Sequence, residues 1–421
     1  MRRASFMSFL LAVTTLAAWP SYAEDWPEWR GPQRAGHSLD TGLLTSWSEN
    51  GPELIWKATG IGAGYSSVTI ADGRVFTMGL RDGKGELIAL DKKDGKELWS
   101  TTIDDHDPNS TPVIDGKTVF ALGWHGDLVA VDTVTGKERW RRHLAKELGG
   151  KTQTNCGFSE SPLIDGEKVI CTPGAADAVV AALKKRTGEL IWKTKLPDDV
   201  GEKGADGASY SSIVISEACG VRHYVALVGR GALGISPHDG RVLWTYNRIA
   251  NEHANVATPV VNGDYIFCST AYQTGSVLLK LVKEPSNKGK LRAEEVYFLK
   301  PKVMQNHHGG VILVGDHIYA GHGHNKGFPL CIDFLTGKEA WRPGRGPGAG
   351  SAALLYADGH IYFRYENGVI ALIEANPEKY VLKSTFTLPN AVDKSWAHPV
   401  VVDGRLYLRE PGTLFCYRVK E

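Results

Sequence analysis

Four histidines stand in an arrangement that could bind a metal ion. They form two pairs, His307 with His308 and His322 with His324. The apolar stretch between the pairs is broken at Gly315-Asp316, which predicts a hairpin that brings both pairs to one end of two adjacent strands. Imidazole nitrogens placed in this way can bind Zn or Cu. Hydrogen-bonded loop histidines would fit the same pattern, so both interpretations stay open.

A second group of polar and aromatic residues lies where short strands are expected to begin or end. Aromatic rings can stack on a planar ligand, and guanidinium groups can pair with its carboxylates. The group therefore fits a small, planar, anionic ligand or cofactor, although the same side chains could simply fill the mouth of a channel. The candidate cofactor-binding residues are Tyr65, Trp124, His125, Asn155, Tyr210, Arg230, Asn255 and Trp396.

The elements that must position these residues follow a repeated pattern. Residues 132–140 read as the end of an apolar strand, a turn containing Gly136, and a strand containing Trp140. In five copies a Trp follows a Gly by four positions, which marks a structural repeat. We expect the Trp to pack between neighbouring repeats. The five are Trp99, Trp140, Trp192, Trp244 and Trp341.

Each repeat reads as four short strands with a Gly-containing hairpin turn, such as Asp72-Gly73, between the first two. Eight such first hairpins can be counted. The eighth repeat ends near Arg418 without a fourth strand, and a lone Trp strand around Trp56 precedes the first repeat. The sequence therefore predicts an all-β fold, a single eight-bladed β-propeller of four-stranded blades whose ring is closed by an N-terminal strand.

The bulk properties fit an exported protein. The chain has 421 residues and a formal net charge of +1, which argues against a nucleic-acid partner. Arg2 and Arg3 precede a short apolar run and a small-residue exit, so we predict a signal peptide in residues 1–23, cleaved after Ala23. An arm (residues 24–52) and the propeller (53–421) would follow, with no transmembrane segment and a periplasmic or secreted location. A disulfide between Cys156 and Cys171 is one possibility in that compartment.

The repeat in residues 130–140 resembles that of the pyrroloquinoline-quinone (PQQ) propellers, a superfamily that includes quinoprotein alcohol dehydrogenases and the BamB-like propellers of outer-membrane barrel assembly. Residues 26–32 resemble the start of many exported bacterial members. The resemblance covers nearly the whole mature chain, and it implies the fold more strongly than any chemistry.

Two functions follow as expectations from this resemblance. The first is a binding or scaffold module of the cell envelope, with an unidentified protein or envelope polymer as partner. The alternative is a PQQ-dependent alcohol dehydrogenase-type oxidoreductase, with PQQ and Ca in the central funnel. The chain lacks the adjacent Cys pair common in the dehydrogenases and has no Cys near the cleavage site for a lipid anchor. Whether it is an enzyme is left open by the sequence.

Overall fold

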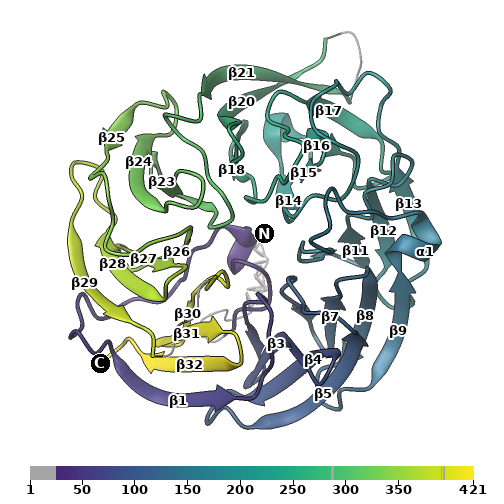
Figure 1. The fold of residues 1–421 in the computed structure, drawn as a ribbon. Coiled ribbons are helices and arrows are strands. Elements are labelled where there is room, and N and C mark those ends of the chain that lie inside the picture. Colours follow the sequence, from purple (N-terminus) through teal and green to yellow (C-terminus); the bar gives the residue numbers. More distant parts are fainter. Residues whose placement is uncertain (1–24, 286–288, 390, 392–393) are drawn as a thin grey trace, which may run out of the picture.

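The computed structural model describes residues 25–285, 289–389, 391 and 394–421, so the predicted signal peptide lies outside the described residues. Eight four-stranded antiparallel sheets are arranged in a ring (Figure 1). This architecture confirms the predicted eight-bladed propeller. In each blade the first strand lies nearest the centre, and the fourth lies at the periphery (Figure 1).

The first seven blades use strands in chain order. Blade one consists of β2 (Thr69–Ala71), β3 (Arg74–Arg81), β4 (Lys84–Asp91) and β5 (Glu97–Asp104), and blade two of β6 (Val113–Asp115), β7 (Thr118–Leu122), β8 (Asp127–Asp132) and β9 (Glu138–His143). Blade three consists of β10 (Leu163–Asp165), β11 (Lys168–Cys171), β12 (Val180–Lys184) and β13 (Leu190–Thr194), and blade four of β14 (Val214–Ser216), β15 (His223–Val228), β16 (Gly231–Ile235) and β17 (Val242–Tyr246).

The remaining blades continue around the ring. Blade five consists of β18 (Val260–Asn262), β19 (Tyr265–Thr270), β20 (Gly275–Lys283) and β21 (Leu291–Leu299), and blade six of β22 (Val311–Val314), β23 (His317–His322), β24 (Phe328–Asp333) and β25 (Glu339–Trp341). Blade seven consists of β26 (Ala352–Ala357), β27 (His360–Tyr365), β28 (Val369–Glu374) and β29 (Leu382–Thr387), and blade eight of β30 (Val400–Val402), β31 (Arg405–Glu410) and β32 (Thr413–Arg418) with β1 (Glu53–Thr59). Helical segments are short: α1 (Leu144–Leu148), η2 (Pro32–Arg34) and η3 (Ala218–Gly220). Among the described residues, no helix is long and apolar enough to cross a membrane.

The ring closes as predicted, because the lone N-terminal strand completes the last blade. Strand β1 pairs antiparallel with β32, and Trp56 lies opposite Cys416. The first and last strands of the propeller thus share one sheet (Figure 1). This closure leaves no blade incomplete and removes the sheet edge that an open array would expose.

The first hairpins use glycine in two ways. In the first blade Ala71 pairs with Arg74, so Asp72-Gly73 is the two-residue loop, and both residues have positive φ. In the second blade Asp115 pairs with Thr118, which moves the loop to Gly116-Lys117. The loop in the second blade therefore begins at the glycine, one position later than in the first blade. The glycine still supplies the positive φ that a two-residue hairpin loop requires.

The repeated Trp packs between blades, as predicted, and its contact is more specific than burial alone. The Trp192 indole donates a hydrogen bond to the Pro237 carbonyl at 3.2 Å, in the third-to-fourth strand turn of the next blade. A Cβ on Gly240 of that turn would lie 2.5 Å from the Trp192 ring. The repeat glycine is therefore needed for the close ring contact as well as for its positive φ. Trp56, Trp99 and Trp140 make the equivalent hydrogen bond and glycine contact with the next blade.

The other four blades depart from this rule, and the fourth and fifth show how. Trp244 donates to His223 Nε2 of its own blade at 3.2 Å, because the next blade has a long β20–β21 hairpin in place of the repeat turn. That next blade has no Trp at the repeat position. Tyr297 takes its role, with its hydroxyl 2.7 Å from the Phe334 carbonyl and its ring against Gly337.

The N-terminal arm enters the centre of the ring (purple in Figure 1). Trp26 is 2% exposed and pairs through its backbone with Ile70 of β2. Farther along, the buried Arg34 guanidinium donates to the carbonyls of Ser161 (3.0 Å) and Ile213 (3.1 Å) of two blades. The arm therefore packs Trp26 against the first blade and ties two further blades together through Arg34.

Candidate functional site

One face of the ring carries a central pocket of about 450 Å³, which we call the funnel pocket. Its walls come from the loops that enter the first strands and from those that link second to third strands. We call this side the funnel face. The opposite side, with the hairpin turns and the Trp–Gly contacts, is the turn face. The funnel pocket is lined by aromatic, hydroxyl and imidazole groups from blades all around the ring.

The arm contributes to the lining of the funnel pocket through Trp29 and Arg30. Trp29 donates from its indole to Thr258 Oγ1 at 3.1 Å, and its ring lies 4.6 Å from that of His398. Arg30 donates to the Val311 carbonyl at 2.6 Å, and burial lowers its pKa to about 10. Sequence reasoning did not select either residue.

Four of the eight residues predicted to bind a cofactor line this pocket: Tyr65, Trp124, Tyr210 and Trp396. The rings of Tyr65 and Trp396 are 4.5 Å apart. The Tyr210 hydroxyl lies 2.5 Å from Thr154 Oγ1, and burial raises the pKa of Tyr210 to about 12. These four residues form aromatic walls that a flat ligand could contact.

The other four lie outside the pocket lining. The His125 side chain is 49% exposed and has its Nε2 3.1 Å from Asp105 Oδ1. Asn155 is exposed. Arg230 is directed to Asp206, at 2.6 Å. The Asn255 side chain is fully buried, where it donates to the Val228 carbonyl and accepts from Asn251.

A stacked pair forms another part of the wall. The His106 ring lies 3.9 Å from the Trp124 ring with an interplanar angle of 16°. Asp107 lies beside His106 and also lines the pocket. Behind them Asp104 accepts hydrogen bonds from backbone amides, yet burial raises its pKa above the ordinary value. The acidic side of the pocket therefore adjoins an aromatic surface.

The predicted histidine pairs do not all meet. The His307 ring lies 3.9 Å from that of His308 and 4.3 Å from that of His324. His322 ends β23 and is buried, and its Nδ1 accepts a hydrogen bond from the Gln305 amide at 3.3 Å. Three of the four predicted metal ligands are thus neighbours in the structure.

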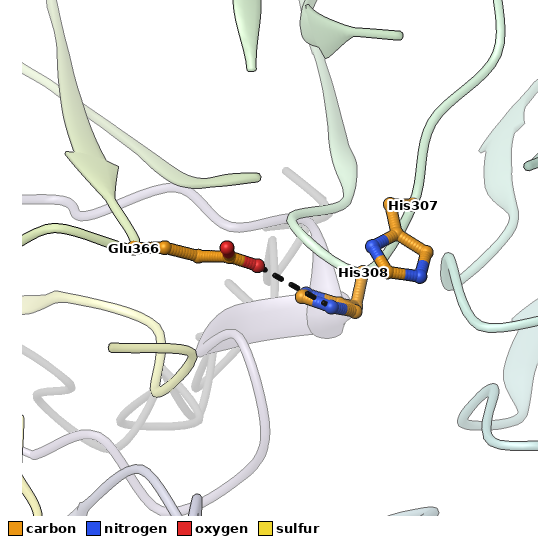
Figure 2. Close-up of side chains that lie close together, drawn as sticks. All are labelled: His307, His308 and Glu366. Carbon is orange, nitrogen blue, oxygen red and sulfur yellow. Dashed lines mark ion pairs between the residues drawn. The ribbon is translucent and has the colours of Figure 1, made fainter. Parts of the chain in front are cut away.

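A carboxylate that sequence reasoning missed joins this cluster. Glu366 follows β27, and one of its oxygens, Oε1, lies 3.7 Å from His308 Nε2 (Figure 2). His307, His308 and Glu366 each offer one ligand atom within 4.8 Å of the others. Glu366, like His324, lies in a loop that links a second to a third strand, so its place on the funnel face could have been foreseen.

Burial controls the charge of these imidazoles. Desolvation, with a smaller contribution from His324, lowers the pKa of His307 to about 3. Desolvation likewise holds the pKa of His308 well below its usual range, and neighbouring imidazoles add to the effect. Both rings are therefore neutral near pH 7, so each keeps one nitrogen lone pair.

Glu160 is a buried carboxyl outside the lining of the funnel pocket. It is 1% exposed, and its Oε1 accepts a hydrogen bond from the Thr172 amide at 3.1 Å, while its Oε2 makes no hydrogen bond to a described residue.

All six cysteines lie in the described part of the chain and are free thiols. The possible disulfide is not formed, since Cys156 is exposed and Cys171 is buried.

Comparison with known families and proteins identifies relatives of the chain. A family model described as outer membrane protein assembly factor BamB matches residues 38–152 and 83–343. BamB of Burkholderia pseudomallei is 27% identical over 237 residues, which are 54% of this chain and 57% of that protein. BamB of Yersinia pestis is 26% identical over 157 residues, 36% of each chain. The chain thus matches little more than half the length of the first relative and about a third of the second.

Solved structures share the fold. BamB from Moraxella catarrhalis gives a TM-score of 0.61 at 16% identity and covers 90% of this chain and 98% of its own. The quinohemoprotein alcohol dehydrogenase from Comamonas testosteroni gives 0.65 at 14% identity, with 95% and 81% covered. Identities this low show a common propeller fold and do not select between a binding protein and a dehydrogenase.

Proposed function

The chain belongs to the family of the outer membrane protein assembly factor BamB, and on this premise we propose that it is an exported binding module of the bacterial cell envelope. The observation that carries the proposal is the family match along residues 38–343, on a ring that is complete and closed by its own N-terminal strand. A rigid closed ring with varied loops on one face suits a scaffold that positions a partner protein.

The partner in this proposal is a protein engaged in outer-membrane assembly, as the names of the relatives state for them. The funnel face is the proposed contact surface because its loops differ from blade to blade. The turn face repeats one arrangement several times and is occupied by contacts between blades.

The test is made in the source bacterium. Deleting the gene should lower the amounts of outer-membrane β-barrel proteins, and the intact gene should restore them. A photo-crosslinker at the exposed Asn155 of the funnel face should capture an envelope protein, whereas one at the exposed Val134 of the turn face should not. Unchanged barrel proteins together with no funnel-face crosslink would refute the proposal.

Export is a separate part of the proposal. Arg2, Arg3 and the apolar run that follows support a cleaved signal peptide. N-terminal sequencing of the protein from the cell envelope should give a chain that begins at Glu24. A chain that retains Met1 and fractionates with the cytoplasm would contradict it.

A second candidate is the quinoprotein oxidoreductase, favoured by one observation, the aromatic walls of the funnel pocket formed by Tyr65, Trp124 and Trp396. These rings fit the planar part of a quinone. The charges fit less well, because Arg230 pairs with Asp206 away from the pocket, and Arg30 already donates to backbone carbonyls. We therefore assign no reaction step to a quinone.

Titration with PQQ and Ca²⁺ separates the two candidates. A ligand at one hundred times its Kd would add about 2.7 kcal/mol of stability, which a melting curve detects easily. The binding-module proposal predicts no shift and no dye reduction with an alcohol. A clear shift accompanied by dye reduction would replace it with the oxidoreductase.

A further inference from the structure

We propose that His307, His308 and Glu366 form a binding site for a divalent transition-metal ion, with zinc the best match to the donor set, in the wall of the funnel pocket. This inference does not depend on the proposed envelope function. It also differs from the four-histidine site predicted from sequence, because a carboxylate from the next blade replaces His322 and His324.

The first support is the meeting of three donors from distant parts of the chain. His307 and His308 lie in the connection from β21 to β22, and Glu366 lies in the loop after β27 (Figure 2). One ligand atom from each lies within 4.8 Å of the other two, and His308 Nε2 is 3.7 Å from Glu366 Oε1. Small side-chain rotations would bring each of these atoms to about 2.0–2.2 Å from one shared zinc ion, the usual distance for its nitrogen and oxygen ligands.

The second support is the state of His308. Its side chain is only 16% exposed, and its Nε2 makes no hydrogen bond to any described residue. A buried polar nitrogen without a hydrogen-bond partner is unfavourable and asks for an explanation, of which a bound ion is one. This same nitrogen is the one that faces Glu366.

The third support is that the other two ligands are already oriented by neighbouring groups. The Trp396 indole donates to Glu366 Oε1 at 2.5 Å. His307 Nδ1 lies 2.9 Å from Ser351 Oγ and its Nε2 lies 3.1 Å from the Tyr272 hydroxyl, so an ion bound at either nitrogen would replace one of these contacts and leave the other to orient the ring. Metal-binding histidines and carboxylates are usually held by such outer hydrogen bonds, which fix the ring orientation and the free lone pair.

The chemistry of the set favours zinc over calcium or magnesium. Two imidazoles and one carboxylate are a known three-ligand zinc set, which leaves one coordination position open, whereas calcium and magnesium prefer oxygen ligands. Both imidazoles are neutral near pH 7 because burial lowers their pKa, so they need not lose a proton to bind. His307 and His308 line the funnel pocket, so the open position would face its interior.

The test uses the full mature chain, stripped with a chelator and titrated with ZnCl₂ by calorimetry and with CoCl₂ by visible absorption. We expect one ion per chain and a Co²⁺ spectrum of a four-coordinate site. His308→Ala and Glu366→Gln should each weaken Zn²⁺ binding by more than about 100-fold, and Trp396→Phe by about 10-fold. His322→Ala is the matched control, since it removes a buried histidine of the same blade and should leave affinity unchanged.

Each outcome decides the proposal. Circular dichroism of the metal-free variants shows whether they fold, and Glu366→Gln, which keeps the shape of the side chain, covers the case in which His308→Ala does not. Wild-type protein that binds no Zn²⁺ at micromolar concentrations would overturn the site. So would a folded Glu366→Gln protein that binds Zn²⁺ like the wild type, or a loss in His322→Ala as large as that in His308→Ala.

Discussion

The turn face and the funnel face are built from the same eight blades, yet they differ in what determines their residues. On the turn face, Trp192 covers Gly240 of the next blade and donates to its turn, and three other blades repeat this arrangement. On the funnel face, the ring and carboxylate contacts differ from blade to blade: His308 meets Glu366, while His106 stacks on Trp124. The repeat therefore fixes the ring and leaves the funnel free to vary.

The largest effect should come from removing a Trp of the turn face. Trp192 is 7% exposed, so Trp192→Ala removes a buried ring and leaves a closed cavity between two blades. We expect the free energy of unfolding to fall by about 3–5 kcal/mol, as measured by urea denaturation. A loss below 1 kcal/mol would show that the blades do not depend on this contact.

The arm should come next, because Arg34 links two blades from inside the ring. Its guanidinium donates to the Ser161 and Ile213 carbonyls and pairs with Glu28 at 3.1 Å. Arg34→Ala leaves those buried carbonyls without their donor, and we expect a loss of about 3 kcal/mol in the same denaturation assay. Exposed Arg186, replaced in the same way, serves as control and should change stability by less than about 0.5 kcal/mol.

The free energy of unfolding should depend on pH through the buried carboxyl of Glu160. Burial raises its pKa from 4.5 to about 7, so its contribution to stability is complete below pH 4.5 and is lost as pH rises through 7. Between pH 5 and pH 8.5 the wild type should lose up to about 3 kcal/mol that Glu160→Gln keeps. Urea denaturation at the two pH values measures the difference. Parallel pH profiles for the two proteins would show that this carboxyl does not titrate as described.

The smallest effect separates the two roles of the repeat glycine. Gly240 and Gly73 have φ of 73° and 71°, but only a Cβ on Gly240 would meet a ring, at 2.5 Å from Trp192. Nothing lies within 4 Å of a Cβ on Gly73. Gly73→Ala should cost about 1 kcal/mol for its backbone conformation alone, and Gly240→Ala about 1 kcal/mol more. Equal melting temperatures of the two variants would remove the ring contact from the explanation.

The sequence predicted the parts of the molecule that are local and periodic. The Gly-to-Trp spacing identified the blades, and the unpaired strand around Trp56 identified how the ring closes. Departures from the repeat were harder to predict. Tyr297 replaces a Trp, and the Trp244 indole donates to His223 because the next blade lacks the repeat turn.

The funnel was predicted only in part, because its contacts join residues that are far apart in the chain. The choice of residues at strand ends gave eight candidates, of which Tyr65, Trp124, Tyr210 and Trp396 line the pocket. That choice could not show that the Asn255 side chain forms its hydrogen bonds within the protein, or that Glu366 lies near His308 although it belongs to the next blade. Such pairings depend on side-chain direction, which spacing along a sequence does not contain.

The most direct test of this division compares the same substitution on both faces. Trp192→Ala opens a closed cavity between blades, whereas Trp396→Ala widens a pocket that is already present in the funnel wall. In urea denaturation we predict a loss of about 3–5 kcal/mol for the first variant and about 1–2 kcal/mol for the second. An equal or larger loss for Trp396→Ala would contradict the account, because the funnel face would then hold the ring together as the turn face does.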